Sequence, residues 1–201
     1  ASGTGIYDLK SWKYAPEFIE ASGIPEHVWP EIVPSTHVLG EIDPKVAELL
    51  GLNENVKVVC GGVDNSCMAL GAKNIKDGRV YTSLGSSAWI AVSSEQPVID
   101  PKAKPFVFAH VMPNMFTAAV SIFSAGTSFA WVKENICSEL KEKAQAENKN
   151  VYDLMTALAA QAPVGSNNLL FNPSLAGGTS QDRSVHIRGA YIGLDLKHGK
   201  A

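Results

Sequence analysis

The fold class is decided by residues 58–65, which read VVCGGVDN. The run Val56–Cys60, apolar except for Lys57, predicts a buried strand. Two glycines then end the strand, and Asp64 stands where an N-cap would start a helix over residues 65–72. In open α/β sheets, ligands bind at the carboxyl ends of strands. The stretch therefore predicts a strand–turn–helix unit that holds a carboxylate at a binding edge.

Asp64 has two interpretations when this unit is taken alone. A carboxylate at the end of a strand can accept the proton of a substrate hydroxyl, as phosphoryl transfer to that hydroxyl requires. Aspartate is also among the best N-cap residues, so Asp64 could serve only to start the helix. From this unit by itself, the cap is the favoured interpretation.

Two later segments combine glycine with hydroxyl residues. Val80–Val92 predicts two strands joined by the turn Gly85–Ser87, whose successive N–H groups can form an anion site. Ser124–Ser128 leads into a helix over Phe129–Ile136, where a helix start attracts anions. The alternatives are an ordinary hairpin turn at the first segment and a simple hydroxyl cap at the second. Neither segment is decisive alone.

Capping and turn residues predict the remaining elements. The mixture is α/β, and a composition shift near Lys73–Gly78 marks the expected domain boundary. The expected elements are a helix at 14–21 ended by Gly23, a helix at 45–50 between Asp43 and Gly51, a hairpin of 106–112 with 116–122, a helix at 151–161, and strands at 169–171 and 190–196.

Composition excludes several classes of protein. A net charge of −3 and a pI near 6.0 give no electrostatic footprint for nucleic acid. Three cysteines without C-x-x-C spacing argue against disulfides and zinc and favour a reducing cytoplasm, with Cys60 and Cys67 as small buried apolar groups. Phe106–Val132 has no charged residue, but His110 and Pro113 interrupt it, so we expect strands there and no membrane span.

The order of these motifs resembles the FGGY family of carbohydrate kinases, and xylulokinases most of all. The resemblance covers essentially the whole chain. It is carried by Ala1–Thr4, Val33–Thr36, Gly61–Asn65, Gly71-Ala72, Ser83–Ser87, Ser124–Gly126 with Trp131, and Arg188–Leu194 with His198.

The resemblance implies an actin-like ATPase (ribonuclease H-like) fold with two domains and a cleft for sugar and ATP. Residues 1–75 would end the first, sugar-binding domain, and 76–201 would begin the second, nucleotide-binding domain. Asp64 matches the catalytic base and Asn65 falls in the substrate pocket. The nucleotide phosphates would lie at Gly85, Ser86 and Gly126.

The same resemblance implies an ATP-dependent sugar kinase that takes xylulose or a related pentulose and uses Mg²⁺. The metal would be held mainly by the nucleotide and by parts that this chain lacks, so we expect no metal ligand here. The chain is expected to be truncated at both ends and inactive alone, and the sequence leaves open whether the intact enzyme is a homodimer. Where many xylulokinases carry Gly-Glu-Arg-x-Pro, this chain has Gln181-Asp182-Arg183-Ser184, and this departure leaves the sugar open.

Two alternatives remain. The first is a catalytically silent actin-like module that binds a sugar or a partner protein; an intact Asp64 argues against it. The second is another phosphotransferase of the same superfold, such as an acetate or hexokinase-like enzyme. The Gly-Gly-x-Asp-Asn element followed by Arg188-Gly189-Ala190 argues against that alternative.

Overall fold

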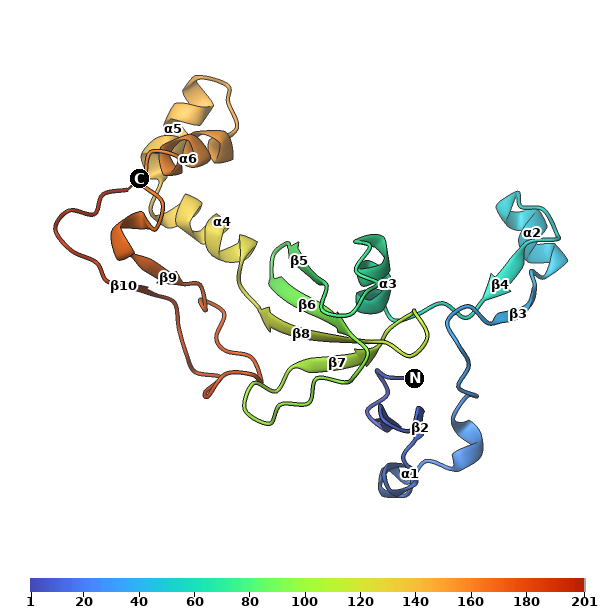
Figure 1. Cartoon of the computed structure of the whole chain (residues 1–201). Helices are drawn as coiled ribbons and strands as arrows, with labels where there is room; N and C mark the ends of the chain where they lie inside the picture. Colours follow the sequence, from blue (N-terminus) through green and yellow to red (C-terminus); the bar gives the residue numbers. More distant parts are fainter. Residues whose placement is uncertain (201) are drawn as a thin grey trace. The chain divides into compact units, whose positions relative to one another are not determined.

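The computed structural model describes residues 1–200, which divide into two compact units. The first unit contains Ala1–Tyr81 and Ile90–Ala119, and the second contains Thr82–Trp89 and the chain from Val120 onward. The largest sheet has four strands in the order β5-β6-β8-β7 (Figure 1). Its strands are β5 Val80–Leu84, β6 Ala88–Ser94, β7 Phe106–Ala109 and β8 Phe116–Ile122. Strands β5, β6 and β8 each contribute residues to both units.

The two predicted hairpins of this sheet are confirmed. β7 and β8 pair antiparallel, with Phe106 opposite Ala119 and Ala109 opposite Phe116. β7 ends earlier than predicted, because residues 110–115 form the turn, in which the His110 N–H donates to the Met115 carbonyl at 2.9 Å. Asn114 in this turn has a φ of 58°, a left-handed conformation that asparagine tolerates well.

Two helices of the first unit end at the glycines predicted to stop them. Helix α2 (Pro44–Leu50) begins where the Asp43 side chain accepts a hydrogen bond from the Lys45 N–H, and it ends at left-handed Gly51, as predicted. Helix α1 (Pro16–Ser22) likewise ends at Gly23. The other elements of this unit are β1 Tyr7–Asp8, β2 Lys13–Tyr14, the 3₁₀ turn Glu26–Val28, β3 Val38–Glu41, β4 Lys57–Val59 and helix α3 Asp64–Gly71.

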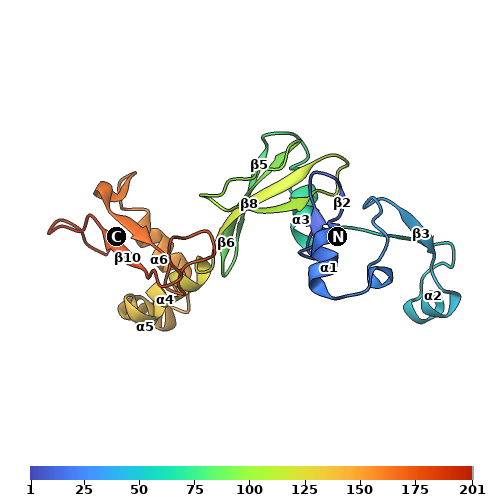
Figure 2. The same ribbon diagram turned by 90° about the horizontal axis from the view of Figure 1, so that it is seen from below.

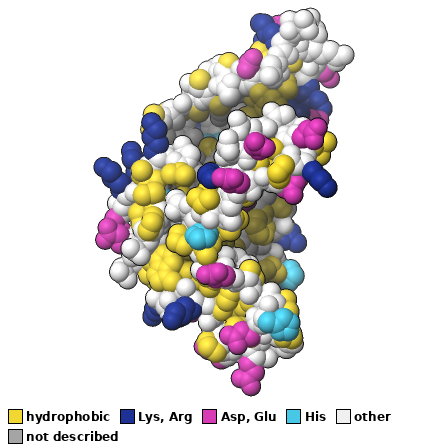
Figure 3. Space-filling model, turned by 90° about the vertical axis from the view of Figure 1, so that its right-hand side faces the viewer, with side chains coloured by type: hydrophobic (Ala, Val, Ile, Leu, Met, Phe, Trp, Pro, Cys, Tyr) yellow, Lys and Arg dark blue, Asp and Glu magenta, His cyan; other side chains and the backbone are white. Residues whose placement is uncertain are grey.

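Strand β4 corrects the prediction of a buried strand. It pairs antiparallel with β3, and every residue of both strands is exposed. Leu39 and Val59 are 62% and 51% exposed, and Leu49 on α2 reaches 83%. Figure 3 shows hydrophobic side chains open to solvent between charged ones on the face that it views. The apolar run identified the strand correctly, but the described residues cover neither of its faces.

The second unit places three helices together: α4 Gly126–Asn135, α5 Ser138–Ala146 and α6 Val151–Ala159 (Figure 2). Strands β9 (Leu170–Asn172) and β10 (Ala190–Ile192) pair antiparallel, and a 3₁₀ turn, Ser166–Asn168, precedes them. β10 is shorter than the predicted 190–196. Among the described residues, no helix is long and apolar enough to cross a membrane.

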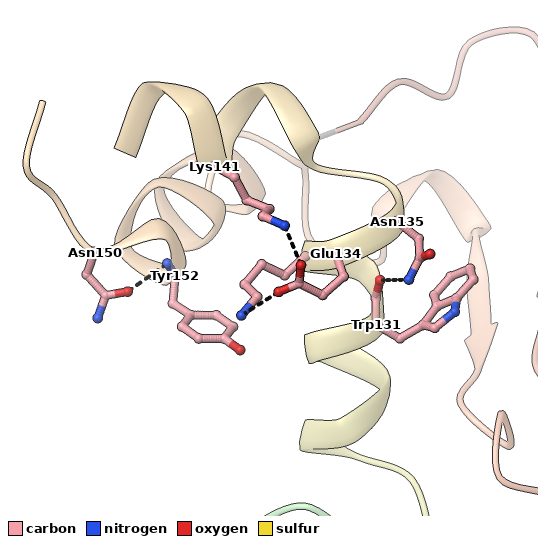
Figure 4. A network of polar contacts seen from close by, with 7 residues as sticks. Trp131, Glu134, Asn135, Lys141, Asn150 and Tyr152 are labelled. Atoms are coloured by element: carbon pink, nitrogen blue, oxygen red, sulfur yellow. Dashed lines mark hydrogen bonds and ion pairs between the residues drawn. The ribbon is translucent and has the colours of Figure 1, made fainter. Parts of the chain in front are cut away.

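Charged side chains join these helices at their solvent face. Glu134 on α4 pairs with Lys133 at 2.8 Å and also with Lys141 on α5 (Figure 4). These two lysines lower the pKa of the Glu134 carboxyl to about 2. Lys133 also lies 5.0 Å from the centre of the Tyr152 ring on α6. All three helices are therefore linked at one exposed polar cluster.

Candidate functional site: two glycine-rich loops and a carboxylate

Asp64 is the first residue of α3, and Val63 occupies the N-cap position. The prediction that Asp64 is the N-cap is therefore wrong by one residue. Its Oδ1 accepts a hydrogen bond from the N–H of the next residue, Asn65, at 2.7 Å. Asp64 is exposed and makes no ion pair within the described part of the chain. A negative charge in the first turn still interacts favourably with the helix dipole.

Two hydrogen bonds hold the first turn of α3 against other elements of its unit. The Ser66 Oγ donates to the Ala109 carbonyl at the end of β7, at 2.7 Å, and Ser66 is only 1% exposed. The Tyr81 hydroxyl donates to the Asn65 carbonyl at 3.2 Å. Asn65 is half-buried, so its backbone is fixed beside the exposed Asp64 carboxylate.

Gly61 and Gly62 meet two different requirements of the loop before Asp64. Gly61 has a φ of +73°, a conformation that a residue with a side chain rarely adopts, and its N–H donates to the Ser35 carbonyl at 2.9 Å. Gly62 has ordinary dihedrals, but a Cβ there would overlap the Val111 Cγ1. The turn after β7 therefore packs directly on the loop that leads to Asp64.

A cavity of about 400 Å³ lies beside this loop within the first unit. It is lined by residues of the N-terminus, of the segment before β3, of the glycine loop and of the turn after β7. These lining residues include Ala1, Ser2, Tyr7, Trp12, Ile32–Ser35, Cys60–Val63 and Ala109–Asn114. The cavity thus reaches the residue immediately before the Asp64 carboxylate.

The second glycine loop, Gly85–Ser87, is joined to the start of α4. The Gly126 N–H donates to the Gly85 carbonyl at 2.9 Å, and the Ala125 N–H donates to the Ser86 carbonyl at 2.9 Å. The Thr127 Oγ1 also donates to the Ser86 carbonyl, at 2.8 Å. A Cβ on Gly126 would lie 2.5 Å from the Gly85 carbonyl oxygen, so only glycine allows this approach.

This arrangement changes the predicted role of the α4 start. Its first amides already donate to the carbonyls of Gly85 and Ser86, and neither Thr127 nor Ser128 caps the helix, because Ala125 is the N-cap. The N–H groups of Ser86 and Ser87 are different: within residues 1–200 they donate to no protein acceptor, and both residues are exposed. The amides that remain for an anion are therefore on the turn, and Gly126 shapes that turn.

Buried serine hydroxyls hold the start of α4 by hydrogen bonds. The Ser124 and Ser128 Oγ atoms lie 2.6 Å apart, and the Ser128 Oγ donates to the Pro173 carbonyl at 2.7 Å. Both serines are at most 3% exposed. Ser124, two residues after β8, and Pro173, directly after β9, are thereby tied to α4.

The loop that departs from the xylulokinase pattern is also built around hydrogen bonds. The Ser121 N–H donates to the Gln181 Oε1 at 2.9 Å, and the Thr179 N–H donates to the Asp182 Oδ2 at 2.6 Å. Gly178 allows a close approach, because a Cβ there would lie 2.5 Å from the Ser184 carbonyl oxygen. The loop has a defined conformation although its sequence differs from the family pattern.

Sequence reasoning missed His110 and Asn74 and misjudged two cysteines. His110 is 5% exposed and Asn74 is 1% exposed, and they are hydrogen-bonded to each other. The available signal was a lone histidine at the end of an otherwise apolar strand. Cys60 and Cys67 are exposed free thiols, so the prediction that they are buried is wrong. Both flank the glycine loop, which leaves them uncovered.

Family models match both parts of this chain. Residues 1–71 match the N-terminal domain of the FGGY family of carbohydrate kinases, and residues 80–201 match the C-terminal domain of that family. Gluconokinase of Bacillus subtilis (strain 168) is 28% identical over 201 residues, which cover 100% of this chain and 39% of that protein. Xylulose kinase of the same strain is 30% identical over 200 residues, covering 100% and 38%.

A solved structure extends the likeness to three dimensions. The crystal structure of gluconate kinase from Lactobacillus acidophilus matches with a TM-score of 0.84 and 26% identity, over 98% of this chain and 38% of that one. This chain therefore spans about two fifths of the length of these relatives. The predicted α/β class and actin-like ATPase fold are confirmed. The chain belongs to the FGGY family of carbohydrate kinases.

Proposed function

We propose that the whole protein is an ATP-dependent sugar kinase in which Asp64 is the general base. The observation that carries the proposal is the exposed Asp64 carboxylate, which forms no ion pair with described residues and follows a glycine loop beside a cavity. A general base must be unpaired and reachable to accept a proton. Membership of a family of carbohydrate kinases supports the same chemistry.

In the proposed reaction, a sugar hydroxyl attacks the γ-phosphorus of ATP while its proton passes to a carboxylate oxygen of Asp64. The new O–P bond forms as the bond between the γ-phosphorus and the bridging oxygen of ADP breaks. Asn65 is assigned to the sugar pocket. Residues 1–75 are assigned to the first, sugar-binding domain, and 76–201 to the second, nucleotide-binding domain.

The nucleotide phosphates are assigned to the turn at Gly85 and Ser86. The exposed amides of Ser86 and Ser87 are suited to phosphate oxygens, and Gly126 keeps the turn against α4. Among the described residues, no three His, Cys, Asp or Glu side chains gather to hold a metal ion. These residues alone do not fit Mg²⁺, and no step of the proposal is assigned to it.

The proposed acceptor is xylulose or a related pentulose, with gluconate as the competitor. The relatives described above are a xylulose kinase, a gluconokinase and a gluconate kinase. A coupled ADP-release assay of the whole protein with D-xylulose, L-ribulose, L-fuculose, gluconate and glycerol tests this preference for a pentulose over gluconate. The proposal expects the highest kcat/KM with a pentulose, and a higher value with gluconate would overturn that choice of sugar.

The Asp64→Asn variant tests the base itself. We expect kcat to fall by roughly 10²–10⁴, the usual contribution of general base catalysis. Asp43→Asn is the matched control, because it makes the same chemical change at an exposed helix cap. Wild-type kcat in the Asp64 variant would refute the role, and sugar binding without turnover by the wild type would identify a silent binding module.

We further propose that the 201-residue chain has no meaningful kinase activity alone, because it spans about two fifths of its relatives. Sugar phosphorylation by the purified chain above its own Asp64→Asn control would contradict this. The three free cysteines favour the cytoplasm as the compartment of the whole protein. Fractionation of cells that express the whole protein checks the compartment.

A further inference from the structure

A buried polar cluster lies at the carboxyl end of α3, opposite the end that carries Asp64. Its members are His110, Asn74 and Ser93, none of which is more than 5% exposed. The Asn74 carbonyl accepts two hydrogen bonds, one from the Ser93 Oγ at 2.7 Å and one from the His110 Nε2 at 3.1 Å. The large majority of buried polar groups in folded proteins are hydrogen-bonded, and in this cluster the Asn74 Oδ1 is an exception, with no partner among the described residues.

The partners of His110 fix its tautomer. The Met112 N–H donates to the Nδ1 at 2.9 Å, and a backbone N–H can only donate. The Nδ1 must therefore be unprotonated. The Asn74 carbonyl can only accept, so the Nε2 must carry the proton. His110 is neutral, and it links two backbone groups that are far apart in the sequence.

The end of β7 consequently holds α3 at two points. Ala109 accepts a hydrogen bond from Ser66, two residues after Asp64, while the adjacent His110 donates to Asn74, just beyond the end of the helix. Two bonds from neighbouring residues fix both the position and the direction of α3. A helix held at one end only would be free to tilt about that point.

His110 also orders the turn that packs on the glycine loop. Its N–H donates to the Met115 carbonyl and its Nδ1 accepts from Met112, so the turn is closed from both sides. The next residue, Val111, occupies the space that a Cβ on Gly62 would need. The loop before Asp64 and the helix after it are therefore both held through His110.

We propose that His110 is a positioning residue that sets the place of the Asp64 carboxylate by joining the α3 end to the turn on Gly62. The inference rests on the proposed function of Asp64 as the base. His110 does not touch the reacting atoms. Its contribution to the rate passes through Asp64 alone.

Two substitutions separate the bonds of His110 in the whole protein. His110→Asn keeps an acceptor near the Nδ1 position and loses the donor to Asn74. His110→Gln keeps a donor near the Nε2 position and loses the acceptor for Met112. Because a base displaced by about 1 Å can cost up to a hundredfold in rate, each variant is expected to lower kcat roughly tenfold to a hundredfold. Unchanged kcat in both variants would overturn the proposal.

A double-mutant cycle with Asp64→Asn distinguishes positioning from general loss of stability. If His110 acts through Asp64, each His110 substitution lowers kcat in the wild type but causes no further loss in the Asp64→Asn background. An equal loss in both backgrounds would overturn the inference and leave the role of Asp64 intact. Wild-type kcat in Asp64→Asn itself would overturn the proposed function, and the inference with it.

Ser93→Ala is the matched control. It removes the other donor to the Asn74 carbonyl without touching the turn on Gly62. We expect a lower melting temperature and wild-type kcat, and a loss of kcat equal to that of the His110 variants would overturn the proposal. If both His110 variants are too unstable to assay, Ser66→Ala tests the same two-point attachment of α3 in the same cycle. Wild-type kcat in Ser66→Ala would then refute it.

Discussion

Gly126→Ala should separate the Gly85–Ser87 turn from α4. The new Cβ would lie 2.5 Å from the Gly85 carbonyl oxygen and 3.2 Å from its carbon, where ordinary contact begins at 3.4 Å. Both obstacles are backbone atoms, so no side chain can rotate away. The turn must move by nearly an ångström, which lengthens the bonds from Gly126 to Gly85 and from Ala125 to Ser86.

The cost follows from these contacts. Overpacking costs about 1–3 kcal/mol, and each weakened amide–carbonyl bond about 1 kcal/mol. With two such bonds weakened, we expect the free energy of unfolding to fall by about 3–5 kcal/mol. Because the same movement displaces the amides of Ser86 and Ser87, KM for ATP should also rise. Thermal unfolding of the whole protein and initial rates at varied ATP concentration measure both effects.

Gly85→Ala is the control for stability. Its Cβ would lie 3.8 Å from the nearest atom, the Ser87 carbonyl oxygen, so it fits without movement. We expect its melting temperature to stay close to that of the wild type. Equal stability of the two alanine variants would refute the argument, because it would show that the approach of Gly126 to Gly85 carries no cost.

Ser128→Ala should cost about 0.5–1.5 kcal/mol, because it removes the hydrogen bond from the Ser128 hydroxyl to the Pro173 carbonyl, which keeps the Leu175 N–H as a donor. Denaturant unfolding measures this cost against exposed Thr156→Ala, and equal values would contradict it. Gly178→Ala should loosen the loop at residues 177–188, since its Cβ would meet the Ser184 carbonyl oxygen. Faster proteolysis than in Gly199→Ala, which has open space, checks this, and equal rates would refute it. Burial lowers the pKa of His110 below 6.5 and outweighs the opposing bond to Asn74. The unfolded state therefore binds the proton more readily, so stability is full above pH 6.5 and falls below it. Melting temperatures from pH 8 to 5 should fall more steeply for the wild type than for His110→Gln, and parallel curves would count against this.

Elements set by neighbouring residues could be predicted from the sequence. Asp43, Pro44 and Gly51 act within one helix, and their chemistry gave the bounds of α2. The turn at Gly85–Ser87 was predicted for the same reason, since a strand pair and its turn are contiguous. The family resemblance then depended on the order of such local motifs.

Features that depend on distant residues could not be predicted. Ser86 accepts hydrogen bonds from the start of α4, and Thr127 lies 41 residues further along the chain. No local pattern indicates that these carbonyls would occupy the amides expected to bind phosphate. The burial of β4 was misjudged for a related reason, because an apolar run shows what a strand can bury and not which residues cover it.

The two attachments of α3 also have a consequence for the order of folding. Ser66 and Ala109 are 43 residues apart, and His110 and Asn74 are 36 apart. Contacts at such separations form late, because the chain entropy of closing the loop must be overcome first. The helix can form locally, but Asp64 reaches its final place only after β7 and its turn are complete. We therefore expect enzymatic activity to return after helical structure during refolding.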